Sequence, residues 1–213
     1  MGTIDSETAD RQLLALLDRY RCPLPFHAAR AQLLGALVSP ASDYSSREAL
    51  AALWGKKSPA FSSGDSEIDA VLQSLSERLS HSETTGETFC LTPLDTQPTR
   101  EELARLALVR REEIDAFVAG LFGNEEALEL TKPAHAALDS MADIRSLLQH
   151  LRNFLDDPMK RSSPEGIAAS LKSVQDMMPP LETAMNKVLQ QCSAVRKQGV
   201  RKVKGADTNR VLH

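Results

Sequence analysis

The chain has 213 residues, of which 42% are hydrophobic and 25% charged, as in ordinary globular proteins of one or two domains. Aromatic residues make up only 4%, so the core must consist mainly of Leu, Ala, Val and Met, which favours helices over strands. The net charge of −4 argues against a general nucleic-acid binder, because phosphate contacts require clustered Lys and Arg.

Targeting signals and paired cysteines are missing from the sequence. The N-terminal residues lack a basic start followed by an apolar run, so no signal peptide is expected. No stretch approaches about 18 uncharged apolar residues, so no transmembrane helix is expected. Cys22, Cys90 and Cys192 are odd in number and widely spaced, which excludes a disulfide framework and a Cys-rich zinc site. We therefore expect a cytoplasmic protein without membrane contact.

Helix signals fill the first part of the chain, with Pro and Gly marking the breaks between helices. The last of these helices carries Ile68, Val71, Leu72, Leu75 and Leu79 at helical spacing. Residues 56–65, with Pro59 and Gly64, are predicted to be a loop. The predicted helices cover residues 6–21, 26–38, 45–54 and 66–79.

The stretch 81–98 is rich in Thr, Ser and Pro and predicts a long surface connection. At most, residues 88–92 form a short extended piece. Four of its side chains are expected to attach it to the core, namely Phe89, Cys90, Leu91 and Leu94.

Residues 99–123 allow two interpretations. They begin with a capping box, in which Thr99 bonds the backbone three residues on and Glu102 reaches back. A break near Leu108 would make a helix-turn-helix, with Ala104 and Ile114 in its small and branched positions. Without a break the segment is one helix of a bundle.

The unbroken helix is the favoured interpretation. Leu108 stands where a helix-turn-helix usually has glycine, and three carboxylates in the second half would meet the phosphates of DNA. As one helix, the segment has an apolar seam that only Arg110 interrupts, and the Arg110 head is expected in water. The seam contains Leu103, Ala107, Arg110, Ile114, Phe117 and Leu121.

The last part of the chain predicts a helix over 132–155 and then an αα-hairpin. Ser163 and Pro164 start the hairpin, and Pro179-Pro180 is expected to form its turn. Its two helices carry narrow apolar seams at coiled-coil spacing, which fit either intramolecular packing or a dimer or partner interface. The candidate interface residues are Ile167, Leu171, Val174, Met178, Leu181, Met185, Val188 and Val195.

The C-terminus is basic, whereas the body is acidic. Residues 196–213 carry six basic side chains against Asp207, which leaves −9 on the remainder. The simplest interpretation is a disordered, solvated tail, and the alternative is contact with an acidic partner. The candidate contacts are Arg196, Lys197, Arg201, Lys202 and Lys204.

No pattern typical of catalysis or cofactor binding occurs. The five histidines are scattered, and no phosphate-binding glycine loop or nucleophile motif is found. We therefore expect no enzymatic activity, no cofactor and no metal. A deep pocket holding His27 or His135 with a carboxylate would argue otherwise.

Several stretches, in order, resemble the YgfB/YecA-like family of small bacterial α-helical proteins. They are AQLLGALV at 31–38, LAALWG at 50–55, FCLTPLD at 89–95, FVAGLFG at 117–123 and AALDSMADI at 136–144. The resemblance covers roughly residues 10–150, and the chain lacks the family's early His-Gly pair and the Cys-rich tail that some longer members carry. It implies an all-α fold, often a homodimer, and a role in regulation or interaction without an established enzymatic activity.

The sequence thus predicts an all-α multi-helix bundle with a C-terminal αα-hairpin and a flexible basic tail. The expected parts are a helical domain at 1–158, the hairpin at 159–198 and the disordered tail at 199–213. The expected function is non-enzymatic interaction with a protein partner or a second copy. The alternative is a DNA-binding regulator that uses residues 99–120 and the tail.

Overall fold

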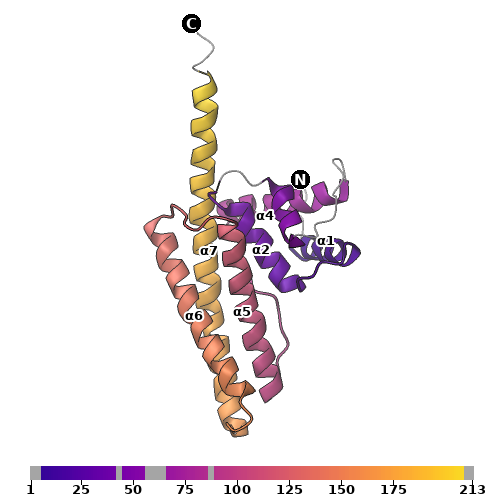
Figure 1. The fold of residues 1–213 in the computed structure, drawn as a ribbon, viewed down its shortest axis with the longest axis vertical. Coiled ribbons are helices and arrows are strands. Elements are labelled where there is room, and N and C mark those ends of the chain that lie inside the picture. The colour runs from indigo at the N-terminus through magenta and orange to yellow at the C-terminus, as the bar shows by residue number, and fades with distance from the viewer. Residues whose placement is uncertain (1–5, 42–44, 56–65, 86–88, 209–213) are drawn as a thin grey trace.

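A computed structural model describes residues 6–41, 45–55, 66–85 and 89–208. Within its helices, the side chains of 6–8, 67, 78–85 and 197–208 lie outside the description, as does the predicted loop at 56–65. Every secondary-structure element of the described residues is a helix, which confirms the predicted all-α fold class (Figure 1). The helices are α1 Ser6–Arg19, α2 Phe26–Val38, α3 Ser46–Ala52, α4 Ser66–Thr85, α5 Arg100–Phe122, α6 Lys132–Asp156 and α7 Pro164–Thr208.

Two hydrophobic cores share α2. One contains Leu13 of α1, Leu50 of α3 and Ile68 of α4, and it is closed by Trp54, whose indole donates to the Tyr20 carbonyl at 2.8 Å. The other lies among α5, α6 and α7 and contains Phe117. Because α2 contributes to both cores, ten of its thirteen residues are buried. The nearly uniform apolar character of α2 follows from this position.

The long helices α5, α6 and α7 form an up-down-up bundle (Figure 1). Arg100 at the start of α5 fixes the end of α6, because its guanidinium donates to the carbonyls of Leu155, Asp157 and Lys160 at 2.7, 2.9 and 2.7 Å. A cation at the carbonyl end of a helix is favoured by the helix dipole. The same contact sets the antiparallel alignment of α5 and α6.

The segment 99–123 is one helix. Thr99 caps α5 by accepting from the Glu102 amide, and the helix continues without a break through Leu108 to Phe122. All six residues of the predicted seam are buried. The helix-turn-helix alternative at 99–120 is therefore wrong, since its turn does not exist.

The predicted αα-hairpin is also wrong. Pro179 and Pro180 lie inside α7 rather than in a turn, and α7 instead pairs with the preceding helix, α6. The two prolines are exposed, so carbonyls that lose an amide donor there face water. Burial of Val174 and Leu181 on either side of the prolines favours continuation of the helix.

The basic end of the chain is helical further than predicted. The disordered tail was expected from residue 199, whereas α7 continues to Thr208. Residues 209–213 lie outside the described part of the chain.

The helices α2 and α5 meet at two glycines. A Cβ atom on Gly35 would overlap the Phe117 carbonyl oxygen and lie 2.9 Å from the Leu121 nitrogen. A Cβ atom on Gly120 would overlap the Gln32 carbonyl oxygen. Only glycine therefore allows the two backbones to approach this closely.

We expect Gly35→Ala and Gly120→Ala each to lower the free energy of unfolding by about 3 kcal/mol or more, because the helices must separate. Chemical denaturation of the purified variants measures this. Gly166→Ala is the matched control, since a Cβ there has no neighbour closer than Ser163 Oγ at 3.6 Å. It should raise stability by about 0.5 kcal/mol. Equal stability of Gly35→Ala and the wild type would contradict the close contact.

Candidate functional site: a clamp on residues 89–95

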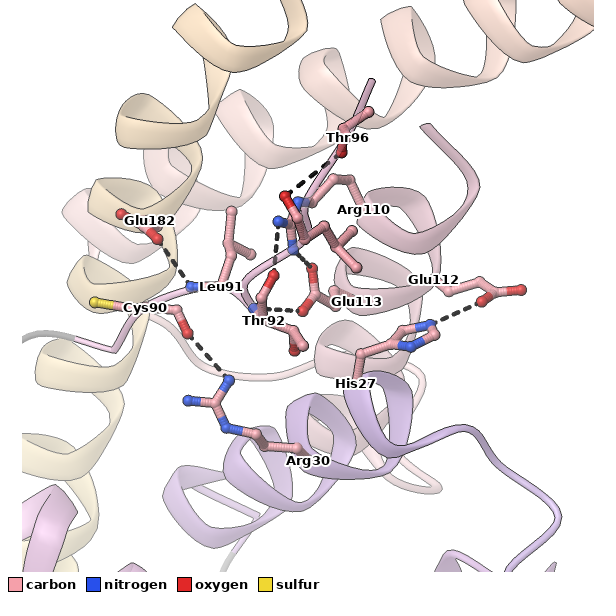
Figure 2. A network of polar contacts seen from close by, with 11 residues as sticks. His27, Arg30, Cys90, Leu91, Thr92, Thr96, Arg110, Glu112, Glu113 and Glu182 are labelled. Atoms are coloured by element: carbon pink, nitrogen blue, oxygen red, sulfur yellow. Dashed lines mark hydrogen bonds and ion pairs between the residues drawn. The ribbon is translucent and has the colours of Figure 1, made fainter. Parts of the chain in front are cut away.

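The segment 89–95 is extended and lies along the bundle between α7 and α5 (Figure 2). Its side chains alternate, with Phe89 and Leu91 buried and Cys90 exposed between them. The predicted attachment to the core is confirmed for Phe89 and Leu91 and, in part, for the half-buried Leu94. It is wrong for Cys90, because period-two alternation turns that side chain to the outside.

Side chains of α7 bind the main chain at the start of this segment. The Asn186 amide accepts from the Phe89 amide at 2.7 Å and donates to the Phe89 carbonyl at 2.9 Å. Glu182, one turn earlier, accepts from the Leu91 amide at 2.8 Å. These contacts replace the bonds that a neighbouring strand would supply.

Side chains of α5 and α2 bind three more main-chain groups of the segment (Figure 2). Glu113 accepts from the Thr92 amide at 3.0 Å, and Arg110 donates to the Thr92 carbonyl at 2.8 Å. Arg30 of α2 donates to the Cys90 carbonyl at 3.0 Å. We call the five residues Asn186, Glu182, Glu113, Arg110 and Arg30 the main-chain clamp.

Two charges of the clamp form a buried ion pair. Arg110 and Glu113 are 2.6 Å apart, and their side chains are only 7% and 1% exposed. The expectation that the Arg110 head reaches water is wrong, because the 89–95 segment covers it. Such a pair stabilises a fold only where further hydrogen bonds compensate for the loss of water around the two charges. Here the amide and the carbonyl of Thr92 provide these hydrogen bonds.

A second pair, between His27 of α2 and Glu112 of α5, borders the clamp. The ring nitrogen and the carboxylate are 2.9 Å apart, with the side chains 15% and 35% exposed. Arg30 also lies over the Phe89 ring, 4.7 Å from its centre. The clamp therefore joins α2, α5, α7 and the connecting segment through charged groups.

The side chains of the clamp bind main-chain groups of the 89–95 segment. His27 does meet a carboxylate, but neither His27 nor Glu112 lines the cavity of about 350 Å³ that lies near the C-terminal ends of α2 and α5, and His135 is exposed. Among the described residues, no three His, Cys, Asp or Glu side chains are grouped as metal ligands would be.

The candidate interface of the C-terminal seams lies mostly inside the molecule. Its apolar side chains pack against the chain's own helices, so those that are buried cannot form an outer surface in this structure. The buried ones are Ile167, Leu171, Val174, Leu181, Met185 and Val188, whereas Met178 and Val195 are half-buried.

The candidate basic contacts separate into two groups. Arg196 is half-buried and donates to the Leu37 carbonyl at the end of α2. The backbone of Lys197, Arg201, Lys202 and Lys204 continues α7, but their side chains lie outside the description.

Comparison with known proteins returned no matching family model, curated protein or solved structure. None of the described helices combines the length and apolar composition that a membrane-spanning helix needs.

The buried ion pair makes a direct prediction. Arg110→Met should lower the free energy of unfolding by about 3–5 kcal/mol, because Glu113 keeps a buried charge without its guanidinium partner. Adding Glu113→Gln should restore part of the loss, since the amide oxygen still accepts from Thr92. Urea denaturation of the two variants measures the difference.

The control for this experiment is the exposed pair Arg47–Asp69, which is 2.5 Å apart with side chains 31% and 55% exposed. Arg47→Met should cost less than about 1 kcal/mol. If Arg110→Met lowered the free energy of unfolding no more than Arg47→Met does, the buried ion pair would not be important for stability.

The three cysteines should differ in reactivity. Burial raises the pKa of Cys192 to about 11, so its thiol is neutral and inaccessible at pH 8, whereas Cys90 is exposed. Burial also raises the pKa of Cys22. A maleimide should modify Cys90 first and Cys192 only in denaturant, as measured by peptide mass spectrometry. Comparable labelling rates for Cys90 and Cys192 in the folded protein would contradict the packing of α7.

Proposed function

We propose that this protein acts without catalysis, by binding an acidic protein partner through the projecting end of α7. The observation that carries the proposal is that α7 extends beyond its last contacts with the bundle. Gln191 accepts from Thr131 at the start of α6, and Arg196 binds the end of α2. Beyond these contacts α7 continues to Thr208, about 18 Å at 1.5 Å per residue, and stands clear of the other helices (Figure 1).

The charge of this end supports an acidic partner. Residues 196–213 contain six basic residues and one acidic residue, although the protein as a whole is acidic. Positions 197, 201 and 204 recur at helical spacing and so belong to one face of the continuing helix. A projecting basic helix on an acidic body favours contact with negative surfaces and orients the encounter.

Self-association and family membership belong to the same proposal. The resemblance to the YgfB/YecA-like family implies an all-α fold, which the described helices have, and often a homodimer. Leu147 and Phe154, seven residues apart on α6, are 55% and 37% exposed and offer an apolar surface for a second copy.

The DNA-binding alternative has less support. Its recognition helix would use the second half of α5, where Arg110, Glu113 and Phe117 are buried in the fold. The basic end of α7 alone would give only binding that weakens steeply with salt.

Photo-cross-linking in cells tests the proposal. A cross-linking residue in place of Gln198 should capture an acidic protein, whereas the same residue in place of the exposed Gln73 of α4 should not. Neutralising four basic residues of the projecting end should abolish the Gln198 product, because the charge attraction is lost. The neutral variant carries Lys197→Gln, Arg201→Gln, Lys202→Gln and Lys204→Gln, and keeps Arg196 for its contact with α2.

Two results would contradict the proposal. One is cross-linking from Gln198 that is unchanged in the neutral variant. The other is recovery of nucleic acid instead of protein. Light scattering of the full chain separately tests the homodimer, which predicts twice the monomer mass.

A further inference from the structure

A cavity of about 350 Å³ lies where α2 and α5 end. Its volume is within the range of small-ligand sites. Small side chains form its walls, among them Ala36 of α2, Ala49 of α3 and Ala119 of α5, and Gly120 lies at the glycine contact between α2 and α5. The cavity exists because the sequence places small residues on three helices around one point.

The described side chains that line this cavity are negative or neutral. The lining residues include Glu125, Gln32, Asn124 and Phe122, and no Lys, Arg or His is among the described ones. The carbonyl ends of two helices, α2 at Val38 and α5 at Phe122, also meet here. Each helix end carries a partial negative charge, so the cavity favours a cation.

Most of the described groups that donate hydrogen bonds to the last carbonyls of α2 and α5 are neutral. The Leu121 carbonyl accepts from the Ser39 hydroxyl at 2.6 Å, and the Phe122 carbonyl accepts from the Glu125 amide at 2.9 Å. At the end of α2, however, the Leu37 carbonyl accepts from the Arg196 guanidinium. The chain therefore already places one of its own cations at one of these helix ends, outside the cavity lining.

We propose that the cavity binds an alkylammonium group. The alkyl stem would pack against the alanines and the Phe122 ring, while the ammonium would lie toward Glu125 and the carbonyl ends. The group can belong to a free amine or to a lysine side chain of another protein. This site is independent of the projecting end of α7.

Titration of the full-length protein with n-butylammonium chloride at constant ionic strength tests the proposal. The amide NMR signals of Gly120 and Gly123 should shift in a saturable way, with a dissociation constant in the millimolar range typical of so small a ligand. n-Butanol, which has the same stem without the charge, should bind about tenfold more weakly, and sodium butyrate should not bind.

Two variants locate the ligand. Glu125→Gln should weaken n-butylammonium binding about tenfold, whereas Glu126→Gln, a neighbour outside the lining, should leave it unchanged. Ala119→Leu should abolish binding, because Ala119 is exposed on α5 and its enlargement fills the cavity without disturbing the core.

A second probe distinguishes the source of the ammonium group. If N-acetyl-lysine methylamide binds as well as n-butylammonium, the cavity accepts a lysine side chain, and if its backbone prevents binding, the ligand is a free amine. Equal affinity for n-butanol and n-butylammonium would overturn the proposal. So would unchanged signals of Gly120 and Gly123 at about 50 mM n-butylammonium, well above the dissociation constant expected for a ligand of this size.

Discussion

Gly35 of α2 and Gly120 of α5 let two helix backbones touch without side chains between them. The contact brings Ser39 close enough for its hydroxyl to bond the Leu121 carbonyl, which satisfies two buried polar groups. It also sets α2 deep enough in the molecule to serve two cores. Without it, α2 would lie farther from α5, and the cavity near the ends of the two helices would lose the wall that Gly120 contributes.

The same contact explains why charged residues are found inside the bundle. With α2 against α5, Arg30 reaches the 89–95 segment from one side while Arg110 and Glu113 reach it from the other. No strand of the described residues pairs with that segment, so its peptide groups need other partners. Long charged side chains can span the gap, and their desolvation is offset by pairing with each other and with the peptide groups.

Much of the helical framework could be predicted from the sequence, because it depends on local signals. The Thr99 cap and the seam of α5 identified one continuous helix, and the confirmed seam rests on spacing alone. The clamp could not be predicted in this way. Asn186 and Phe89 are 97 residues apart. A side chain that binds a distant peptide group produces no recognisable sequence pattern around either residue. The sequence showed Arg110 as an interruption of an apolar seam. It did not show that Arg110 is buried, because the 89–95 segment that covers it lies outside α5.

The error at Pro179-Pro180 has a different origin, since the sequence contained a signal against a turn. From Ile167 to Met178 the apolar residues of α7 are spaced by 4, 3 and 4 residues. The next spacing, from Met178 to Leu181, is 3 and continues the alternation. The seam therefore stays in phase across the prolines, whereas a turn would have no reason to preserve it. Each proline removes an amide donor and its ring crowds the carbonyl four residues earlier, but burial of the seam on both sides outweighs this local cost.

A continuous α7 has a mechanical consequence that a hairpin would not have. One helix carries Glu182 and Asn186 of the clamp, then Arg196 at the end of α2, and then the projecting basic end. A helix transmits displacement along its axis, because each turn is bonded to the next. A partner that holds the projecting end would therefore act first on Arg196 and α2, and through the same helix on the 89–95 segment. The contacts that stabilise the fold are thus also those through which binding at this end would reach the interior.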